Sequence, residues 1–387
     1  MSIIQSRLAR IGVERLSRRR ASIAKPAVSA TGRKTCAVIE AYNRHDEVYL
    51  TTVYLLQSLG YEVHVFNTWR NRMKNSFIHA PGVRPHIVSK RSAKKVLSAA
   101  EARAFDLVVF NTMEGAEVVR SAQRIGARTP VLGFIHNGSF VSAKPEYRQL
   151  IGNPRCHLMA LAPYVAEQFA KEVSAGFMYP VFFNDREVPS IAPTPGKRRF
   201  CVQGYFDPGR RHYDMLLEAV RTLAAEQRND FEVWVMGRSV AKTFRDFSKK
   251  VKQQRLERFF RYSWKGIGYS AYYRLLNSVD FILPLISPDS HPSYFLSKST
   301  SSIAAAVGFG KVPLVHHRLA ELYGIADSCL TYSDDLVNVM RNALNMSASE
   351  LDSYRALSSA VRDRFLTASR EQLSRAIHQV SIVGGAP

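Results

Sequence analysis

The chain alternates short apolar runs with longer amphipathic stretches from residue 35 onward. Apolar, β-branched runs bounded by polar residues are typical of strands, and longer runs with helical spacing predict helices. In the first half a helix is expected at 47–60, another from about 114 to 125, and a third opening at Pro163. The expected strands there are 35–40, 61–66, 106–110, 130–136 and 157–162. Strands that are apolar throughout and alternate with helices predict a parallel sheet covered on both faces.

A proline-rich stretch interrupts this alternation at 178–199, with four prolines and a glycine in 22 residues. Such a composition is typical of a linker. The alternation then restarts, with helices expected at 210–227 and 240–256, and the end of the chain is predicted to be helical from about 347 to 380. The strands expected in this second half are 199–206, 231–237, 258–264, 278–286, 311–317 and 328–333.

This pattern predicts an α/β fold of two Rossmann-like parallel-sheet domains that face a central cleft. In such folds ligands bind at the carboxyl ends of the strands, so we expect the functional residues there. The predicted division is a basic N-terminal arm (1–34), a first domain (35–180), a linker (181–198), a second domain (199–346) and C-terminal helices (347–387).

Charge is distributed unevenly over the 387 residues, which carry 54 Lys and Arg against 32 Asp and Glu, a net +22. Residues 1–34 hold nine basic residues and one acid, and residues 197–274 hold eighteen basic and eight acidic residues. Excess positive charge points to an acidic partner, whether nucleic acid, anionic lipid or a phosphorylated substrate. The excess in 197–274 is interpreted here as part of a phosphate-binding site.

The N-terminal arm places Ile4, Leu8 and Ile11 on one helical face flanked by arginines, which suits an anionic membrane surface. A solvated tail and a targeting presequence are the alternatives. Four scattered cysteines without a C-x-x-C pair favour reduced thiols and a cytoplasmic location, peripheral on the inner face of the membrane if the arm binds it. The absence of a long apolar run predicts no membrane span.

Two stretches of the second half look suited to phosphate. Gly204 ends a strand, and Arg210 and Arg211 open the next helix, where guanidinium groups and the helix N-terminus can hold a diphosphate. Further on, Lys298, Ser299 and Thr300 begin a polar cluster at the start of an Ala-rich helix, more hydroxyls than capping requires. Arg238, after the strand at 231–237, is a fourth candidate cation. No Walker, kinase, zinc-protease or nucleophile-elbow motif occurs.

These elements resemble the C-terminal domain of GT-B glycosyltransferases, especially the family 4-like group. Gly204 to Ala219 resembles the family's G-R-x(4–5)-K-G element with about one residue inserted, and 271–287 resembles its l-y-x-x-a-D-v-f-v-x-P-s element. The segment 304–315 keeps the glycine–proline–valine ending of the last motif. In the first half, 45–66 and GFIHN (133–137) are more loosely similar.

The resemblance implies a nucleotide-diphosphate sugar as donor, bound by the second domain, and an acceptor bound by the first. It implies no metal and no further cofactor, because arginine, lysine and helix dipoles stabilise the departing diphosphate. One departure is notable: retaining members carry a glutamate pair around the last motif, whereas 294–306 contains no acid. The stereochemical outcome therefore stays open between retention and inversion.

The base that an inverting reaction needs is sought at the strand ends of the first domain. Glu40 and Asp46 are the preferred candidates, Glu114 is a further one, and His136 is expected to contact the sugar. A lipid-linked or polysaccharide acceptor near the membrane is consistent with the basic arm. The rival interpretations are a non-catalytic GT-B-like partner in polysaccharide assembly, a different sugar or phosphate-ester enzyme, and a nucleic-acid-binding protein, although no nucleic-acid-binding motif occurs.

Overall fold

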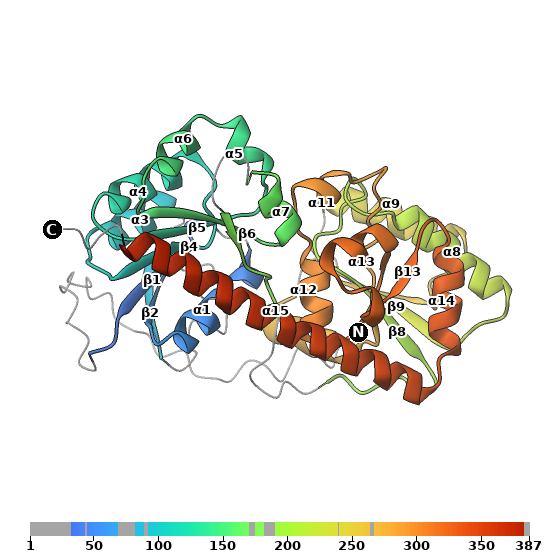
Figure 1. Ribbon diagram of the computed structural model, residues 1–387. Helices are drawn as coiled ribbons and strands as arrows, with labels where there is room; N and C mark the ends of the chain where they lie inside the picture. Colours follow the sequence, from blue (N-terminus) through green and yellow to red (C-terminus); the bar gives the residue numbers. More distant parts are fainter. Residues whose placement is uncertain are drawn as a thin grey trace, which may run out of the picture.

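The structure is a computed structural model that describes residues 32–42, 45–68, 82–88, 92–169, 175–181, 190–238, 240–263 and 267–382. Nearly all of the predicted basic arm (1–34) and much of the predicted linker lie outside the described residues. Two α/β halves are present, one on each side of a central region, and a long C-terminal helix runs along both of them (Figure 1).

The first sheet contains seven strands, all parallel, in the order β3-β2-β1-β4-β5-β6-β7. The central strands are buried on both faces, as their continuous apolar runs predict. Two edge strands were not predicted, because β3 contains a proline and is partly exposed and β7 has three residues. The strands are β1 (Thr35–Ile39), β2 (Glu62–Thr68), β3 (Val83–Val88), β4 (Leu107–Phe110), β5 (Val131–Ile135), β6 (Cys156–Ala160) and β7 (Ala175–Phe177).

Helices cover both faces of this sheet. Their apolar residues recur at helical spacing and pack on the strands, as in α4, where Val118, Val119 and Ala122 are buried. The helices are α1 (Asp46–Ser58), α3 (Ala93–Glu101), α4 (Ala116–Gly126), α5 (Ser139–Ala143), α6 (Glu146–Ile151) and α7 (Pro163–Glu167).

The second sheet contains six parallel strands in the order β10-β9-β8-β11-β12-β13, the same order as the first six strands of the other sheet. The strand expected at 278–286 is much shorter, because the chain leaves the sheet after two residues and Leu285 has a positive φ of 54°. The strands are β8 (Arg198–Gln203), β9 (Phe231–Met236), β10 (Phe260–Ser263), β11 (Phe281–Ile282), β12 (Val312–His316) and β13 (Leu330–Tyr332).

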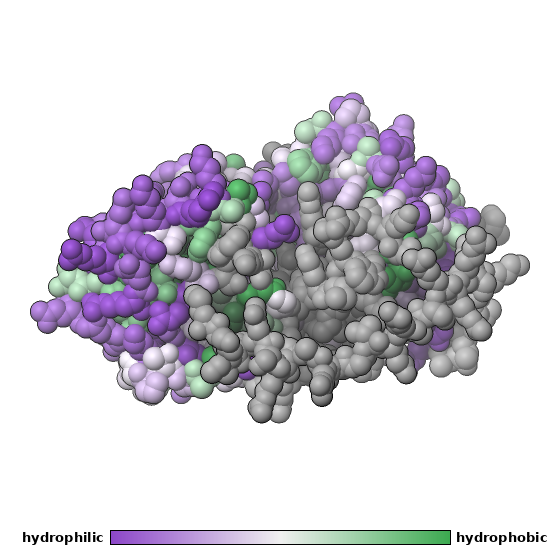
Figure 2. Space-filling view, turned by 180° about the vertical axis from the view of Figure 1, so that it is seen from behind, coloured by the Kyte–Doolittle hydropathy of each residue, from purple (hydrophilic) through white to green (hydrophobic). Residues whose placement is uncertain are grey.

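The helices of the second half include the two expected after β8 and β9. They are α8 (Tyr213–Ala225), α9 (Ala241–Gln253), α10 (Tyr269–Ser278), α11 (Ser293–Leu296), α12 (Ser301–Gly308), α13 (His317–Tyr323), a short 3₁₀ turn η2 (Ala326–Ser328) and α14 (Leu336–Asn345). Seen from behind, hydrophilic side chains cover most of the described surface of this half, on the left (Figure 2).

The C-terminal helix α15 (Ala348–Ile382) ties the two halves together (Figure 1). Its first buried residue, Leu351, joins the core of the second half, and Leu373 packs with the first sheet. In between, Phe365 stacks on Tyr179 with ring centroids 3.8 Å apart. The chain therefore crosses between the halves twice, once after β7 and again along α15. Within the described ranges no helix is both long and apolar enough to cross a bilayer.

Candidate active site

A cavity of about 690 Å³ lies where the carboxyl edges of the two sheets face each other. The first half contributes residues that follow β5 and the loop that follows β4, together with the start of α1. The second half contributes Gly204 after β8, the turn before α8 and the segment from Ser290 to Ser301. Three permanent cations, Arg210, Arg211 and Lys298, and one carboxylate, Glu114, are among the described lining residues. The sequence-based expectation of a site at the strand ends between two sheets agrees with this geometry.

Arg211 is held in place by the protein itself. The side chain is buried, and its guanidinium donates to the backbone oxygen of Pro284 at 2.5 Å and to the hydroxyl of Ser302 at 3.3 Å. Gly204 has a φ of +101°, and a Cβ at this position would lie 2.8 Å from the Arg211 guanidinium. The absence of a side chain at Gly204 thus leaves room for Arg211, a second reason for glycine besides the backbone conformation.

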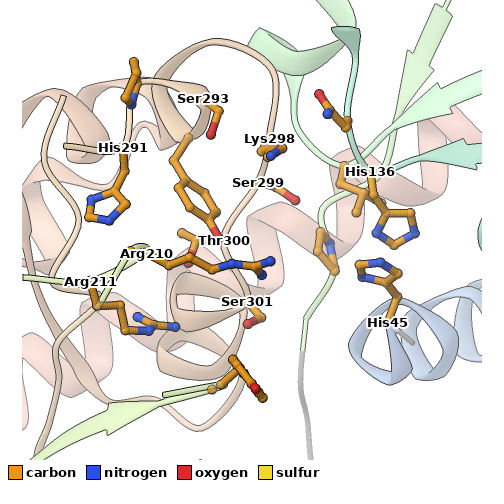
Figure 3. A pocket seen from close by; sticks show the side chains of 18 of the residues that line it. His45, His136, Arg210, Arg211, His291, Ser293, Lys298, Ser299, Thr300 and Ser301 are labelled. Carbon is orange, nitrogen blue, oxygen red and sulfur yellow. The ribbon is translucent and has the colours of Figure 1, made fainter. Parts of the chain in front are cut away.

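Arg210 is the exposed counterpart. Its side chain is 63% exposed, and its guanidinium pairs with Asp207 at 3.2 Å. Figure 3 shows the Arg210 side chain extending into the space between Thr300 and the first half. An exposed arginine of this kind can turn from one partner to a ligand at little cost, because solvent screens its ion pair.

The hydroxyl cluster at the start of α12 divides into structural and open groups. Thr300 caps the helix, since its hydroxyl accepts from the amide of Ser302 at 3.2 Å. The buried Ser302 hydroxyl accepts from Arg211 and from the Gln203 amide at 3.1 Å. Capping and packing thus account for the hydroxyls of these two residues; Lys298, Ser299, Thr300 and Ser301 line the cavity, whereas Ser302 does not.

The segment that carries Lys298 is docked on the first half as well as on its own sheet. The amide of Gly138 donates to the oxygen of Ser297 at 2.8 Å, and Asn137 and Lys298 form an isolated antiparallel bridge. The hydroxyl of Tyr164, from α7, donates to the backbone oxygen of Lys298 at 2.6 Å. Lys298 is therefore positioned by contacts from both halves.

On the opposite wall, the rings of His136 and His45 are in contact, with centroids 3.6 Å apart and planes tilted by 35° (Figure 3). Burial and the neighbouring His45 hold the pKa of His136 well below its usual range, so this imidazole is neutral. Its Nε2 lies 2.9 Å from the backbone oxygen of Asn111. Because a carbonyl oxygen only accepts, Nε2 carries the proton and Nδ1 keeps a lone pair. His136 can thus accept a hydrogen bond from a ligand hydroxyl, as expected for a sugar contact.

Glu40 lies beneath this wall and is not among the residues that line the cavity. Its carboxyl group is 1% exposed and accepts from Asn111 at 2.7 Å, Thr112 at 2.8 Å and the amide of Tyr42 at 2.8 Å. Burial outweighs these hydrogen bonds and raises the pKa of Glu40 to about 8. A carboxyl group that is protonated at neutral pH and closed off from the cavity is poorly suited to act as a base.

The remaining predicted residues divide between the cavity and other places. Asp46 begins α1 directly after His45, but its side chain lies outside the described part of the chain. Arg238 is exposed and is absent from the described lining. Glu114 lines the cavity, and its Oε1 accepts from the amides of His136 and Asn137, both at 3.1 Å. The wall that carries His136 is thus fixed by a carboxylate that also lines the cavity.

Sequence reasoning missed two histidines. His45 follows β1 in a polar loop, next to the predicted Asp46. His291 lies in the Pro- and Ser-rich segment after β11, where Ser290 bridges it to His212. Burial, His212 and Arg211 lower the pKa of His291. Both positions follow strands, so a search for every titratable residue at a strand end would have found them.

The excess charge of 197–274 belongs mostly elsewhere, which corrects the sequence-based interpretation. Of the described cations in that stretch, Arg210 and Arg211 line the cavity. The many lysines and arginines of α9 and the turn after it are exposed on a different surface. Net charge along a sequence does not show which side of the molecule it occupies.

Comparison with known proteins finds similar architectures among solved structures. No protein-family model and no curated protein matches the sequence. Among solved structures, Anabaena Alr3699/HepE in complex with UDP and glucose is similar with a TM-score of 0.61 and 11% identity, covering 89% of this chain and 99% of that one. WaaG, a glycosyltransferase involved in lipopolysaccharide biosynthesis, is similar with a TM-score of 0.55 and 16% identity, covering 91% and 100%.

A third similar structure is the trehalose-6-phosphate synthase OtsA, with a TM-score of 0.56 and 10% identity, covering 89% of this chain and 99% of that one. These proteins share the two facing α/β halves over almost their full length. At such low sequence identity the likeness shows architecture alone, and on that basis this chain has the GT-B fold.

Proposed function

We propose that the protein is a glycosyltransferase that takes a sugar from a nucleotide-diphosphate donor. One observation carries the proposal: Arg210, Arg211 and Lys298, at the carboxyl edge of the second sheet, face His45, His136 and Glu114 across a single cavity. Cations on one wall suit a diphosphate, and polar groups that accept hydrogen bonds on the other suit sugar hydroxyls. The similar structures with UDP and glucose support this choice of ligand class.

In this proposal Arg210 and Lys298 contact the diphosphate, because both line the cavity and neither guanidinium nor ammonium is enclosed by the protein. Arg211 contributes its charge from a fixed position. The free backbone N–H groups at the N-terminus of α12 add partial positive charge beside Ser299 and Thr300. These groups stabilise the negative charge that develops as the sugar–phosphate bond breaks, a role that needs no metal ion.

On the acceptor side, the neutral His136 orients a hydroxyl through Nδ1. Glu114 is the carboxylate among the described lining residues, so in an inverting reaction it is placed to take the acceptor proton, with His45 as the neighbouring imidazole. No carboxylate from 290–301 lines the cavity. This arrangement favours a mechanism in which a carboxylate of the first half acts as the base.

The acceptor is proposed to be a lipid-linked sugar or a polysaccharide close to a membrane. The support is the basic, weakly amphipathic segment at the start of the sequence, whose charge suits an anionic surface. Transfer assays with membrane extracts and with short soluble glycans as acceptors distinguish this class from a small-molecule acceptor.

A screen of nucleotide sugars tests the central proposal. The purified protein is expected to gain thermal stability with one class of UDP-, GDP- or ADP-sugar, to bind it in calorimetry, and to release the nucleoside diphosphate on turnover. Binding without turnover under acceptor-rich conditions supports the non-catalytic GT-B-like partner instead. If no nucleotide sugar binds while duplex DNA or RNA does, the proposal is wrong.

Removing the hydroxyl of Tyr164 tests the contact between the halves. Tyr164→Phe should cost about 1 kcal/mol of unfolding free energy, because the oxygens of Lys298 and Tyr294 lose a donor. It should also weaken donor binding several-fold, because Lys298 is no longer fixed from the first half. Tyr147→Phe is the matched control, since it removes a hydroxyl that donates to Met113 at 2.6 Å within the first half. Equal donor affinity in both variants would show that Tyr164 supports the fold alone.

A further inference from the structure

Helix α9 carries a row of lysines and arginines on its outer side, away from the central cavity. Four of them, Lys242, Arg245, Lys249 and Lys252, are called the α9 stripe here. Their spacing of three, four and three residues places them within an arc of about 80° at 100° per residue. The buried residues Phe244, Phe247 and Val251 occupy the opposite arc of the same helix. The stripe therefore lies on the outer side of the helix, and Lys242 at its edge also lines a smaller cavity beside α8.

The α9 stripe has one acidic neighbour on its own helix, Asp246, which lies four residues after Lys242 and three before Lys249. All four side chains are exposed, and none forms an ion pair with any described residue. Lys250, which points to a different side, pairs with Asp214 at 2.7 Å. Beyond the helix, Arg255 and Arg258 are exposed too and extend the row of positive charge.

The fold does not require these cations. Lysines in the last turn of a helix interact favourably with its dipole, which accounts for Lys252. Lys242 and Arg245 lie at the positive end, where the first turn contains no acid and further positive charge is unfavourable. A row of like charges spread over three turns also repels itself. Retaining it costs stability, so it is expected to serve a contact outside the described chain.

We propose that the α9 stripe binds an anionic lipid bilayer through its headgroups. A convex helix with long, flexible cations meets a flat surface, and each lysine or arginine near such a surface adds to the attraction. Single-stranded nucleic-acid sites usually add aromatic stacking to charge, whereas the phenylalanines of α9 are buried in the core; a duplex remains an outcome of the test. This inference does not rest on the proposed activity, because none of the stripe residues lines the central cavity.

Co-sedimentation of the full chain with vesicles tests the proposal. The quadruple variant Lys242→Gln, Arg245→Gln, Lys249→Gln, Lys252→Gln is compared with wild type on vesicles of phosphatidylcholine containing one third phosphatidylglycerol, at low salt. The partition coefficient should fall more than about tenfold. Wild-type binding should also fall with added salt and be absent on phosphatidylcholine alone.

The matched control removes four exposed charges from the first half through Lys94→Gln, Lys95→Gln, Arg120→Gln and Arg148→Gln. This control loses the same net charge as the α9 variant. It therefore distinguishes binding through the α9 surface from a general attraction by the net positive charge of the protein. Thermal unfolding checks that both variants fold. Equal loss in the two variants, or no loss in the α9 variant, overturns the proposal. Loss of duplex RNA or DNA binding with vesicle binding intact also overturns it and points to a nucleic acid instead.

Discussion

Lys298→Met should weaken binding of the nucleotide-sugar donor by about tenfold to hundredfold, the largest effect that we expect from a single change at the cavity. A hydrogen bond to a charged group contributes about 1.5–3 kcal/mol, and every 1.4 kcal/mol corresponds to a factor of about ten. Lys298 is placed by three contacts of its own backbone segment, so methionine can keep the segment in position while removing the charge. Calorimetric titration with the donor that the screen identifies measures the change.

The double variant Lys298→Met, Arg210→Met should bind more weakly still, because both cations line one cavity and, in the proposed function, contact the same diphosphate from different segments. Lys94→Met is the control, since it removes an exposed lysine of α3. Retained affinity in the double variant would exclude a diphosphate between these residues and leave Arg211 as the cation of the cavity. Arg211 itself is a poor choice for the first test, because its loss removes the donor to the backbone oxygen of Pro284 and one of the two donors to Ser302.

Glu40→Gln should change how stability depends on pH. The pKa of Glu40 is about 8 in the folded protein, against an ordinary value of 4.5 for glutamic acid. The unfolded chain therefore ionises first, and the wild-type free energy of unfolding should fall as pH rises from about 5 to 8, by up to about 1.4 kcal/mol per pH unit. Below pH 4.5 Glu40 is protonated in both the folded and the unfolded state, so its contribution to the free energy of unfolding is fully present.

Glutamine does not ionise, so the variant should lack this component of the pH dependence. The variant has a lower free energy of unfolding by an amount that does not vary with pH, because the side-chain NH2 group of glutamine must face a hydrogen-bond donor. This donor is either the Asn111 and Thr112 side chains or the backbone amide of Tyr42. The difference in unfolding free energy between wild type and variant should therefore shift with pH in favour of glutamine, by several kcal/mol between pH 5 and 8. Chemical denaturation across that range measures it. Parallel profiles would mean that Glu40 stays ionised in the folded protein.

The positions of strands and helices could be predicted from the sequence where burial alone decides them. The runs at 35–40, 106–110 and 130–136 are apolar on both faces, and only a central parallel strand buries both. The edge strand β3 and the short strand β7 escaped prediction because edge strands do not need that pattern. The chain from 281 to 286 is apolar throughout, yet just two of its residues belong to a strand, since burial does not require a sheet.

The position of the cavity could be predicted from the sequence. Its cations could be predicted better than the residues of the opposite wall. Arg210 and Arg211 follow a strand shortly before a helix begins, and Lys298 lies shortly before α12 begins, which are local patterns that the sequence displays. Glu40 follows a strand in the same way, but three hydrogen bonds from residues after β1 and β4 enclose it. Whether a residue at a strand end faces a ligand or the core depends on partners that are distant in sequence.

Local patterns of burial and charge are enough to predict two parallel sheets, the succession of strands and helices along the chain, and the cations that precede α8 and α12. The other features of the site depend on tertiary contacts. The tertiary structure paired His45 with His136, docked the Lys298 segment on Tyr164, buried Glu40 and turned the charge of α9 away from the cavity. Each of these depends on which residues far apart in the chain meet, and hydrophobic periodicity does not encode such contacts.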